Sequence, residues 1–170
     1  ALASANQSFQ YASAMEANEW VKMKQDGPIS KSRFDHSAVC IGDKMLVFGG
    51  YCSGESNDLW SYDPKANEWT EIKPDGPIPK PRLGHSAVNI GDKMLVFGGH
   101  GYCSGESNDL WSYDPEANQW TEIKQDGPTP KPRRDHSAVC IGDKMLVFGG
   151  LSRNVLSDLW SYDPKKRQNG

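Results

Sequence analysis

Histidine recurs at one repeated position of this chain and is the residue type there best suited to chemistry. His36, His85 and His136 are each followed by Ser-Ala-Val and lie 49 and then 51 residues apart. Imidazole ligates metals and exchanges protons near neutral pH, so a ring of such groups would make a polar binding site. The alternative, which we favour, is that each imidazole hydrogen-bonds neighbouring backbone.

An enzyme active site needs unlike groups that converge on one reacting atom, usually a nucleophile, a base and an orienting residue. Repetition works against such a site. The copies differ mainly at Phe34, Leu83 and Arg134, at the inserted pair His100-Gly101, and over residues 151–156. These positions contain no Ser-His-Asp or Cys-His order, so we predict no catalytic residues and no enzyme.

The cysteines follow the same duplication. Cys40 and Cys140 are equivalent positions, and Cys52 and Cys103 are copies of one loop position. The chain has no Cys-x-x-Cys, so neither a disulfide framework nor a structural zinc site is expected, and no cofactor is predicted. Free thiols favour a reducing compartment, and a cytoplasmic location is the expectation.

Composition excludes several function classes. The 170 residues are 36% apolar with a net charge of −3, which is typical of a globular protein. The longest apolar stretch, residues 45–48, is far shorter than the ~20 residues of a membrane span. An acidic chain lacks the clustered cations that nucleic-acid binding requires. Residues 1–15 match no repeat and are expected to be a leader, linker or tag remnant.

Short strands must position these residues. Each copy reads as four stretches of alternating or continuous apolar character that end at Gly-Asp or Asp-Pro turn signals. The pair Gly49-Gly50 is expected to release the backbone after the third of them. In the first copy the strands are predicted at residues 20–24, 36–41, 44–48 and 58–62.

A tyrosine and a tryptophan seven residues apart complete the pattern, as in Tyr62 with Trp69 and Tyr113 with Trp120. A repeat of about 50 residues indicates a solenoid, an array or a propeller. An apolar run that ends in Gly-Gly and is followed by this Tyr-Trp pair resembles the kelch repeat, which is one four-stranded blade of a β-propeller. The resemblance covers residues 17–165. It implies an all-β, kelch-type β-propeller of three four-stranded blades within residues 16–170. The near identity of the copies suggests recent duplication or deliberate construction.

Each end of the repeat array lacks one member of the Tyr-Trp pair, and the other end has the member that is missing. Tyr162 has Asn169 in place of the expected tryptophan, and Trp20 has Ser13 in place of the expected tyrosine. Propellers usually have four to eight blades, so three blades in one chain should not close. We therefore predict a C2 homodimer that forms a six-bladed propeller, with a fragment of a longer propeller as the alternative. The residues expected at the closure are Trp20, Val21, Met23, Trp160 and Tyr162.

The resemblance further implies a non-enzymatic binding module or a self-assembling scaffold. In kelch proteins similar to this chain, one face holds the loop between the first and second predicted strands and the loop between the third and fourth. That face binds partners, and arginines near repeat starts take acidic peptides. A guanidinium matches a carboxylate bidentately. The alternative is that these arginines pair with Asp35, Glu55, Glu106 and Asp135. The candidate binding residues are Arg33, Phe34, Tyr51, Arg82, Leu83, His100, Tyr102, Arg133, Arg134 and Arg153.

Two further alternatives follow from the same resemblance. A kelch-like copper oxidase would need tyrosine and histidine ligands and a cysteine crosslinked to a tyrosine. The adjacent pairs Tyr51-Cys52 and Tyr102-Cys103 do not match that arrangement. The chain could instead be a piece of a larger kelch adaptor protein.

Overall fold

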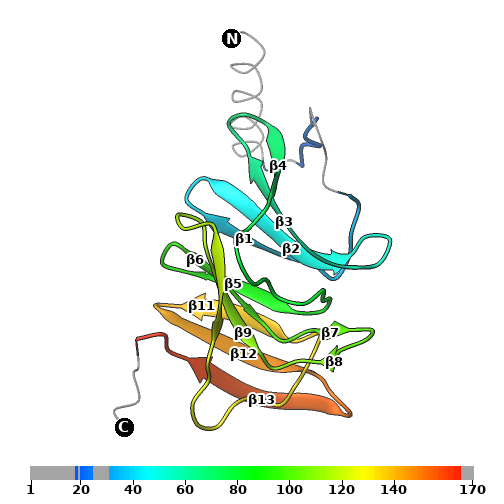
Figure 1. Ribbon diagram of the computed structural model, residues 1–170, viewed down its shortest axis with the longest axis vertical. Coiled ribbons are helices and arrows are strands. Elements are labelled where there is room, and N and C mark those ends of the chain that lie inside the picture. Colours follow the sequence, from blue (N-terminus) through cyan, green and yellow to red (C-terminus); the bar gives the residue numbers. More distant parts are fainter. Residues whose placement is uncertain (1–17, 19, 25–30, 166–170) are drawn as a thin grey trace.

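Short apolar strands joined by glycine turns form antiparallel sheets in sequence order. A computed structural model describes residues 18, 20–24 and 31–165 (Figure 1). The first sheet contains four strands in the order of the chain, as the repeat predicts. These are β1 (Ser37–Ile41), β2 (Lys44–Tyr51), β3 (Glu55–Asp63) and β4 (Glu68–Ile72).

The second and third sheets repeat this order. The second sheet consists of β5 (Ser86–Ile90), β6 (Lys93–Phe97), β9 (Leu110–Asp114) and β10 (Gln119–Ile123), with a separate hairpin of β7 (His100–Gly101) and β8 (Gly105–Glu106). The third sheet contains β11 (Ser137–Ile141), β12 (Lys144–Leu151) and β13 (Val155–Tyr162). Its fourth strand is missing from the described residues. None of the described residues forms a helix that is long and apolar enough to cross a membrane.

The double glycine lies within a strand in the first repeat, which corrects the expectation that it ends one. β2 continues through Gly49 and Gly50 to Tyr51, and the register with β3 shifts between Phe48 and Gly50. Gly50 has a φ of 86°, and a Cβ there would lie 2.6 Å from the carbonyl oxygen of Phe34. Glycine is therefore required because the backbone bulges against the preceding loop.

The strand predicted over residues 20–24 does not form within this chain. Trp20 is fully exposed. A strand needs a partner for its backbone groups, and the neighbour that this segment would need is not supplied by the described residues.

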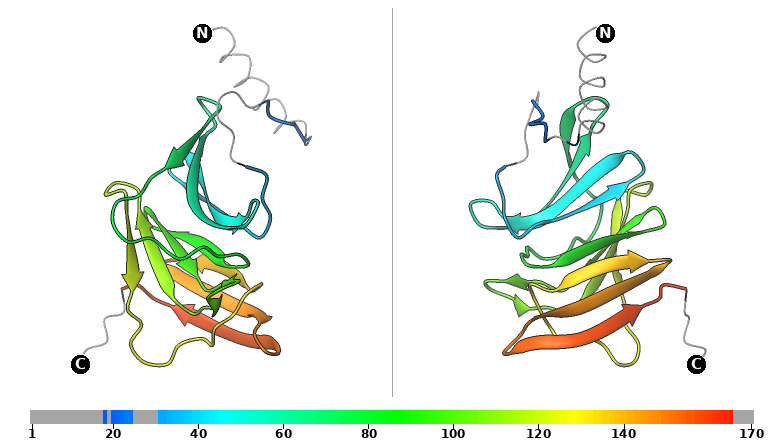
Figure 2. Two further views of the ribbon diagram at one scale, coloured as in Figure 1. Left: turned by 45° about the vertical axis from the view of Figure 1, so that its right-hand side comes forward. Right: turned by 180° about the vertical axis from the view of Figure 1, so that it is seen from behind.

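The three sheets stack face to face, with the first at one end and the third at the other (Figures 1 and 2). One apolar core lies between the first and second sheets and includes Leu46, Phe48 and Met94. A second core lies between the second and third sheets and includes Phe97, Leu110 and Met145. Both faces of the middle sheet are consequently covered, whereas each outer sheet has only one neighbour.

The same polar and aromatic contact joins each pair of sheets. The Phe48 ring packs edge-on against His85, at a centroid distance of 5.4 Å, and lies 4.9 Å from Trp120. The Ser37 hydroxyl and His85 Nε2 share a 2.8 Å hydrogen bond across the junction. In the next junction Phe97 packs on His136 and Ser86 bonds to its Nε2. His85 and His136 therefore join neighbouring sheets through hydrogen bonds to serine hydroxyls.

Burial keeps these imidazoles neutral. Loss of hydration, with the positive charge of Arg82 nearby, lowers the pKa of His85 to about 3. Burial and Arg133 lower the pKa of His136 to about 4. In the unfolded chain both groups titrate near 6.5.

The junction histidines predict a loss of stability in mild acid. The unfolded chain binds protons below pH 6.5 while the folded chain does not, so the free energy of unfolding is highest above pH 6.5 and falls toward pH 4. The expected loss is about 2 kcal/mol per histidine between pH 7 and pH 5. Urea unfolding at several pH values measures it.

A variant that carries His85→Gln and His136→Gln is the matched control, since it retains polar groups that do not titrate. Its slope between pH 7 and pH 5 should be much shallower, and the remainder is expected from His36, whose pKa is also lowered by burial and by Arg33. An equally steep slope in this variant would assign the acid sensitivity to other groups.

Candidate functional site

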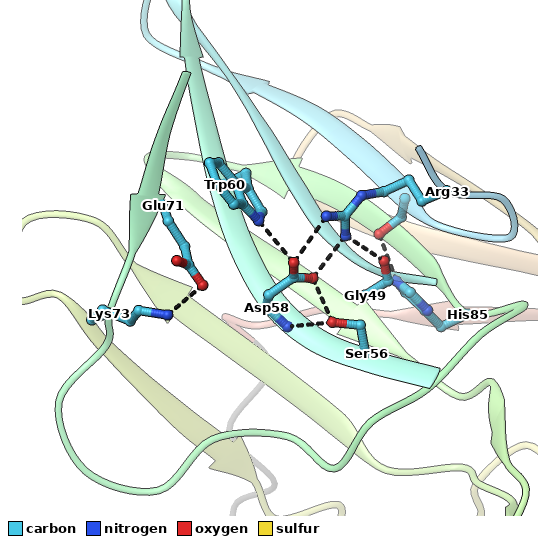
Figure 3. A network of polar contacts seen from close by, with 9 residues as sticks. Arg33, Gly49, Ser56, Asp58, Trp60, Glu71, Lys73 and His85 are labelled. Atoms are coloured by element: carbon cyan, nitrogen blue, oxygen red, sulfur yellow. Dashed lines mark hydrogen bonds and ion pairs between the residues drawn. The ribbon is translucent and has the colours of Figure 1, made fainter. Parts of the chain in front are cut away.

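The repeated arginines lie inside a hydrogen-bond network. Arg33 donates from Nη1 and Nη2 to the Asp58 carboxylate at 2.7 and 2.9 Å, and from Nη1 to the carbonyl of Gly49 at 2.8 Å. The same carboxylate accepts hydrogen bonds from Ser56 Oγ and Trp60 Nε1 (Figure 3). This network ties the loop before β1 to the end of β2 and to β3.

The network recurs in the other two sheets. Arg82 pairs bidentately with Asp109, and Arg133 pairs bidentately with Asp158. The side chains of Arg82 and Arg133 are 4% and 0% exposed. None of the three guanidiniums is therefore open to an acidic peptide, contrary to the prediction from the repeat, because each is paired with an internal carboxylate.

The alternative that the arginines pair with carboxylates of the chain is thus correct. The expected carboxylates Glu106 and Asp135 are partners of Arg134, but those expected for the three repeated arginines were wrong. Their partners are the aspartates that precede Leu-Trp in each repeat. The sequence carried a signal for them, since each aspartate follows its arginine by 25 or 27 residues.

The hydrogen-bonded ion pairs lower the pKa values of these carboxylates. Partial burial raises the pKa of Asp58, but hydrogen bonds from Arg33, Ser56 and Trp60 outweigh it and hold that pKa at about 2. Hydrogen bonds from Arg133 and Trp160 lower the pKa of Asp158 below its usual range. These carboxylates consequently remain ionised at any physiological pH.

Four candidate residues from two repeats gather into an aromatic cluster, defined as Phe34, Tyr51, His100 and Tyr102. The ring centroids of Phe34 and Tyr51 are 5.2 Å apart, those of Tyr51 and Tyr102 are 6.3 Å apart, and those of His100 and Tyr102 are 5.8 Å apart. Phe34 and Tyr102 are 57% and 67% exposed. The cluster therefore presents aromatic surface to solvent across the junction of the first two sheets.

Backbone bonds fix this cluster. Phe34 and Tyr51 form an isolated bridge, and Leu83 and His100 form its counterpart in the next repeat. The Tyr102 amide donates to the Glu55 carboxylate at 2.9 Å, which holds the β7–β8 hairpin against the first sheet. Leu83, a candidate binding residue, is buried and does not face solvent.

The third repeat carries charge where the first carries aromatic rings. Arg134 bridges Leu151, as Phe34 bridges Tyr51, and donates to the Asp135 carboxylate at 2.6 Å. Its guanidinium also lies 3.9 Å from Glu106. Arg153 is exposed. These two arginines are the candidates on which an anionic contact would depend.

A groove of about 490 Å³ opens beside the third sheet. Its lining includes the apolar residues Phe97, Leu110 and Met145 and the half-buried Trp160 and Tyr162, together with polar side chains of residues 124–130. It lies along β13, where β4 and β10 add a fourth strand to the other two sheets. The groove thus borders β13, the edge of the third sheet at which the described residues supply no fourth strand.

The segment 20–24 lies at the opposite end of the stack, in a related position. Asn67 Nδ2 donates to the carbonyl of Lys24 at 2.6 Å, and Asn118 Nδ2 donates to the carbonyl of Lys73 at 2.8 Å. Lys73 directly follows β4, the outer strand of the sheet that precedes Asn118. By this repetition residues 20–24 occupy the place of an outer strand of a sheet that would precede the first one. Within one chain Trp20, Val21 and Met23 do not meet Trp160 and Tyr162.

The described residues were expected to contain no metal site, and their possible metal ligands lie apart. These residues contain no group of three histidine, cysteine, aspartate or glutamate side chains placed to hold a metal ion. All four cysteines are free thiols.

Comparison with known proteins places the repeat in a family. The model of the KLHDC2/KLHL20/DRC7 Kelch-repeats domain matches residues 3–168. A Rho GTPase-activating protein, gacHH, of Dictyostelium discoideum is 35% identical over 82% of this chain and 6% of its own length. Host cell factor of Drosophila melanogaster is 31% identical over 78% of this chain and 10% of its own length. Kelch domain-containing protein 3 of Bos taurus is 30% identical over 77% of this chain and 37% of its own length.

The matched part is a small share of each relative, so these relatives carry much sequence beyond the region they have in common with this chain. What is shared is the repeat itself, and the antiparallel sheets described above are the product of that repeat. On the match over residues 3–168, the chain belongs to the kelch-repeat family.

Proposed function

We propose that this chain is a protein-interaction module that two copies complete as a closed six-bladed propeller. The observation that carries the proposal is the exposed apolar face of the third sheet. Phe148 and Leu159 are 55% and 63% exposed, whereas their counterparts Phe48 and Leu59 in the first sheet are fully buried. A large exposed apolar patch of this kind indicates a surface that another protein covers.

The first sheet offers a matching surface at the other end of the stack. Met45 is 37% exposed, although its counterparts Met94 and Met145 are buried. His36 is also exposed. If a second copy follows the internal geometry, the partner's Phe148 packs against His36 and Trp69 as Phe48 packs against His85 and Trp120.

The outer strand supplies a second contact. Residues 20–24 of one copy fit the groove along β13 of the other, where Trp20 would lie beside Tyr162 as Trp120 lies 5.2 Å from Tyr113. Because the two contacts are equivalent by a twofold axis, a dimer has no remaining open sheet face or open groove of this kind. Closure also covers strand edges that invite aggregation.

The role of the closed ring is binding rather than catalysis. Repeated positions serve the fold, and the positions that differ between repeats cluster on the loop surface, where the aromatic cluster lies. An anionic partner would depend on Arg134 and Arg153, since the other candidate arginines face internal carboxylates. The fragment alternative makes a different assignment, in which a later strand of a longer chain fills the groove.

The mass in solution tests the closure directly. Light scattering across a dilution series is expected to give twice the 18.8 kDa of one chain. A stable monomer with an exposed third sheet would contradict the dimer and favour the fragment alternative.

Replacing Trp20 with alanine should weaken the dimer without unfolding the chain. The side chain is fully exposed in one chain, so its loss costs little there, whereas burial of a tryptophan at each closure contributes about 3 to 5 kcal/mol. The dissociation constant measured by analytical ultracentrifugation should rise at least about a hundredfold. Trp20→Phe is the matched control and should retain most of the affinity. Equal affinities for the wild-type and alanine chains would remove residues 20–24 from the interface.

A charge at Phe148 tests the sheet face independently of the strand. In Phe148→Asp the carboxylate is solvated in one chain but would be buried unpaired in the dimer, which costs several kcal/mol. The expected product is a folded 18.8 kDa monomer with an unchanged circular dichroism spectrum. Phe148→Leu, which retains an apolar side chain, should remain dimeric. A dimeric Phe148→Asp chain would show that another surface holds the copies together.

A further inference from the structure

We propose that the aromatic cluster is a docking site for an arginine-bearing peptide segment of a partner protein. The cluster and the carboxylates around it come from one chain. The inference therefore goes beyond the proposed closure and does not depend on it.

The cluster presents π surfaces that a cation can approach. Phe34 and Tyr102 are more than half exposed, and each ring packs on a second aromatic ring, Tyr51 or His100, that holds its orientation. Arginine stacks on such faces because its planar guanidinium is weakly hydrated. The β7–β8 hairpin that carries Tyr102 is itself fixed through Glu55, so little side-chain or loop ordering is needed on binding.

The charge around the cluster is negative. Asp35 directly follows Phe34 and is exposed, and Glu106 pairs with His100 across the hairpin. Neither Asp35 nor Glu55 forms a salt bridge with another described residue. The carboxylates beside the cluster are Asp35, Glu55 and Glu106. The cations nearby are Arg134, whose guanidinium lies 3.9 Å from Glu106, and the exposed Lys80, which lines one pocket with His100 and Glu106.

The internal arginine networks explain why carboxylates outnumber cations near the cluster. Each repeat contributes an arginine near the loop surface, but the guanidiniums of Arg33 and Arg82 point inward to Asp58 and Asp109. The surface therefore retains its acids while these cations are committed to the interior. An arginine from a partner would meet an aromatic face and a carboxylate at the same place, and a glutamate would meet neither a free guanidinium nor a favourable field.

A pair of labelled peptides tests the proposal. The probe is a fluorescein-labelled peptide of sequence Gly-Arg-Leu-Arg-Gly, and its control is Gly-Glu-Leu-Glu-Gly, both titrated with the full chain and followed by fluorescence anisotropy. Binding of the arginine peptide alone is expected, and its affinity should fall as salt is raised from about 0.05 to 0.5 M. Equal binding of the glutamate peptide, or no binding of the arginine peptide, would overturn the proposal.

Variants locate the site. Tyr102→Ala should weaken the arginine peptide roughly two- to fivefold, and Phe34→Ala combined with it roughly tenfold. Asp35→Asn removes one charge and suits the positive φ of 55° at this position, since asparagine tolerates that region. It should also weaken binding. Ile78→Ala, which shortens an exposed apolar side chain outside the cluster, is the control and should leave the affinity unchanged. Wild-type affinity in the Phe34→Ala/Tyr102→Ala chain would place any peptide binding elsewhere.

The same titration with Phe148→Asp separates this proposal from the closure. A monomeric Phe148→Asp chain should bind the arginine peptide as the wild-type chain does. Loss of binding in that variant, with the fold intact, would show that the site needs the second copy and would contradict a site within one chain.

Discussion

The structure depends on the burial of one phenylalanine ring per sheet. Phe48 is covered only because the next sheet places His85 and Trp120 over it, so no sheet completes its own core. The same ring in the third sheet, Phe148, is more than half exposed. A repeat that cannot bury its apolar face alone must stack, and a stack of such repeats must end in a cap or close on itself. The need for a neighbouring sheet is thus a property of each single repeat.

The arginine networks explain why the repeated residues serve the fold, while the residues that differ between repeats are free to bind partners. Arg33 bridges a loop, the carbonyl of Gly49 and the carboxylate of Asp58, so it fixes the path of three segments at once. A residue with that role must recur in every sheet, as Arg82 and Arg133 do. Surface specificity is left to positions where the copies differ, because these make no contribution to the shared framework. Phe34 and His100 of the aromatic cluster lie at such positions, whereas Tyr51 and Tyr102 are copies of one loop position that the third repeat lacks.

Much of this fold could be predicted from the sequence, because period, strand patterning and turn signals all agree locally. The stacking order, the lone tyrosine at residue 162 and the structural role of the histidines all follow from the repeat. Three features were not predicted, and the first is that residues 20–24 form no strand within one chain, because a partner strand is lacking. The continuation of β2 through Gly49-Gly50 depends on a bulge that only the facing loop at Phe34 explains. The carboxylate partner of each arginine depends on side-chain direction, which distinguishes Asp58 from the equally available Asp35 only in three dimensions.

The twofold symmetry of the proposed dimer would affect how tightly a partner binds the aromatic cluster. One chain carries one aromatic cluster, so a closed pair of chains carries two that are related by a twofold axis. A cation–π contact at an exposed site is worth only about 0.5 to 1 kcal/mol, and a single short segment would therefore bind weakly. A partner with two arginine-bearing segments, or a dimeric partner, would engage both clusters. Its second contact would then form at an effective concentration set by the linker rather than by the solution. Dimer closure would therefore favour partners with two arginine-bearing segments, because a partner with one segment gains no affinity from the second cluster.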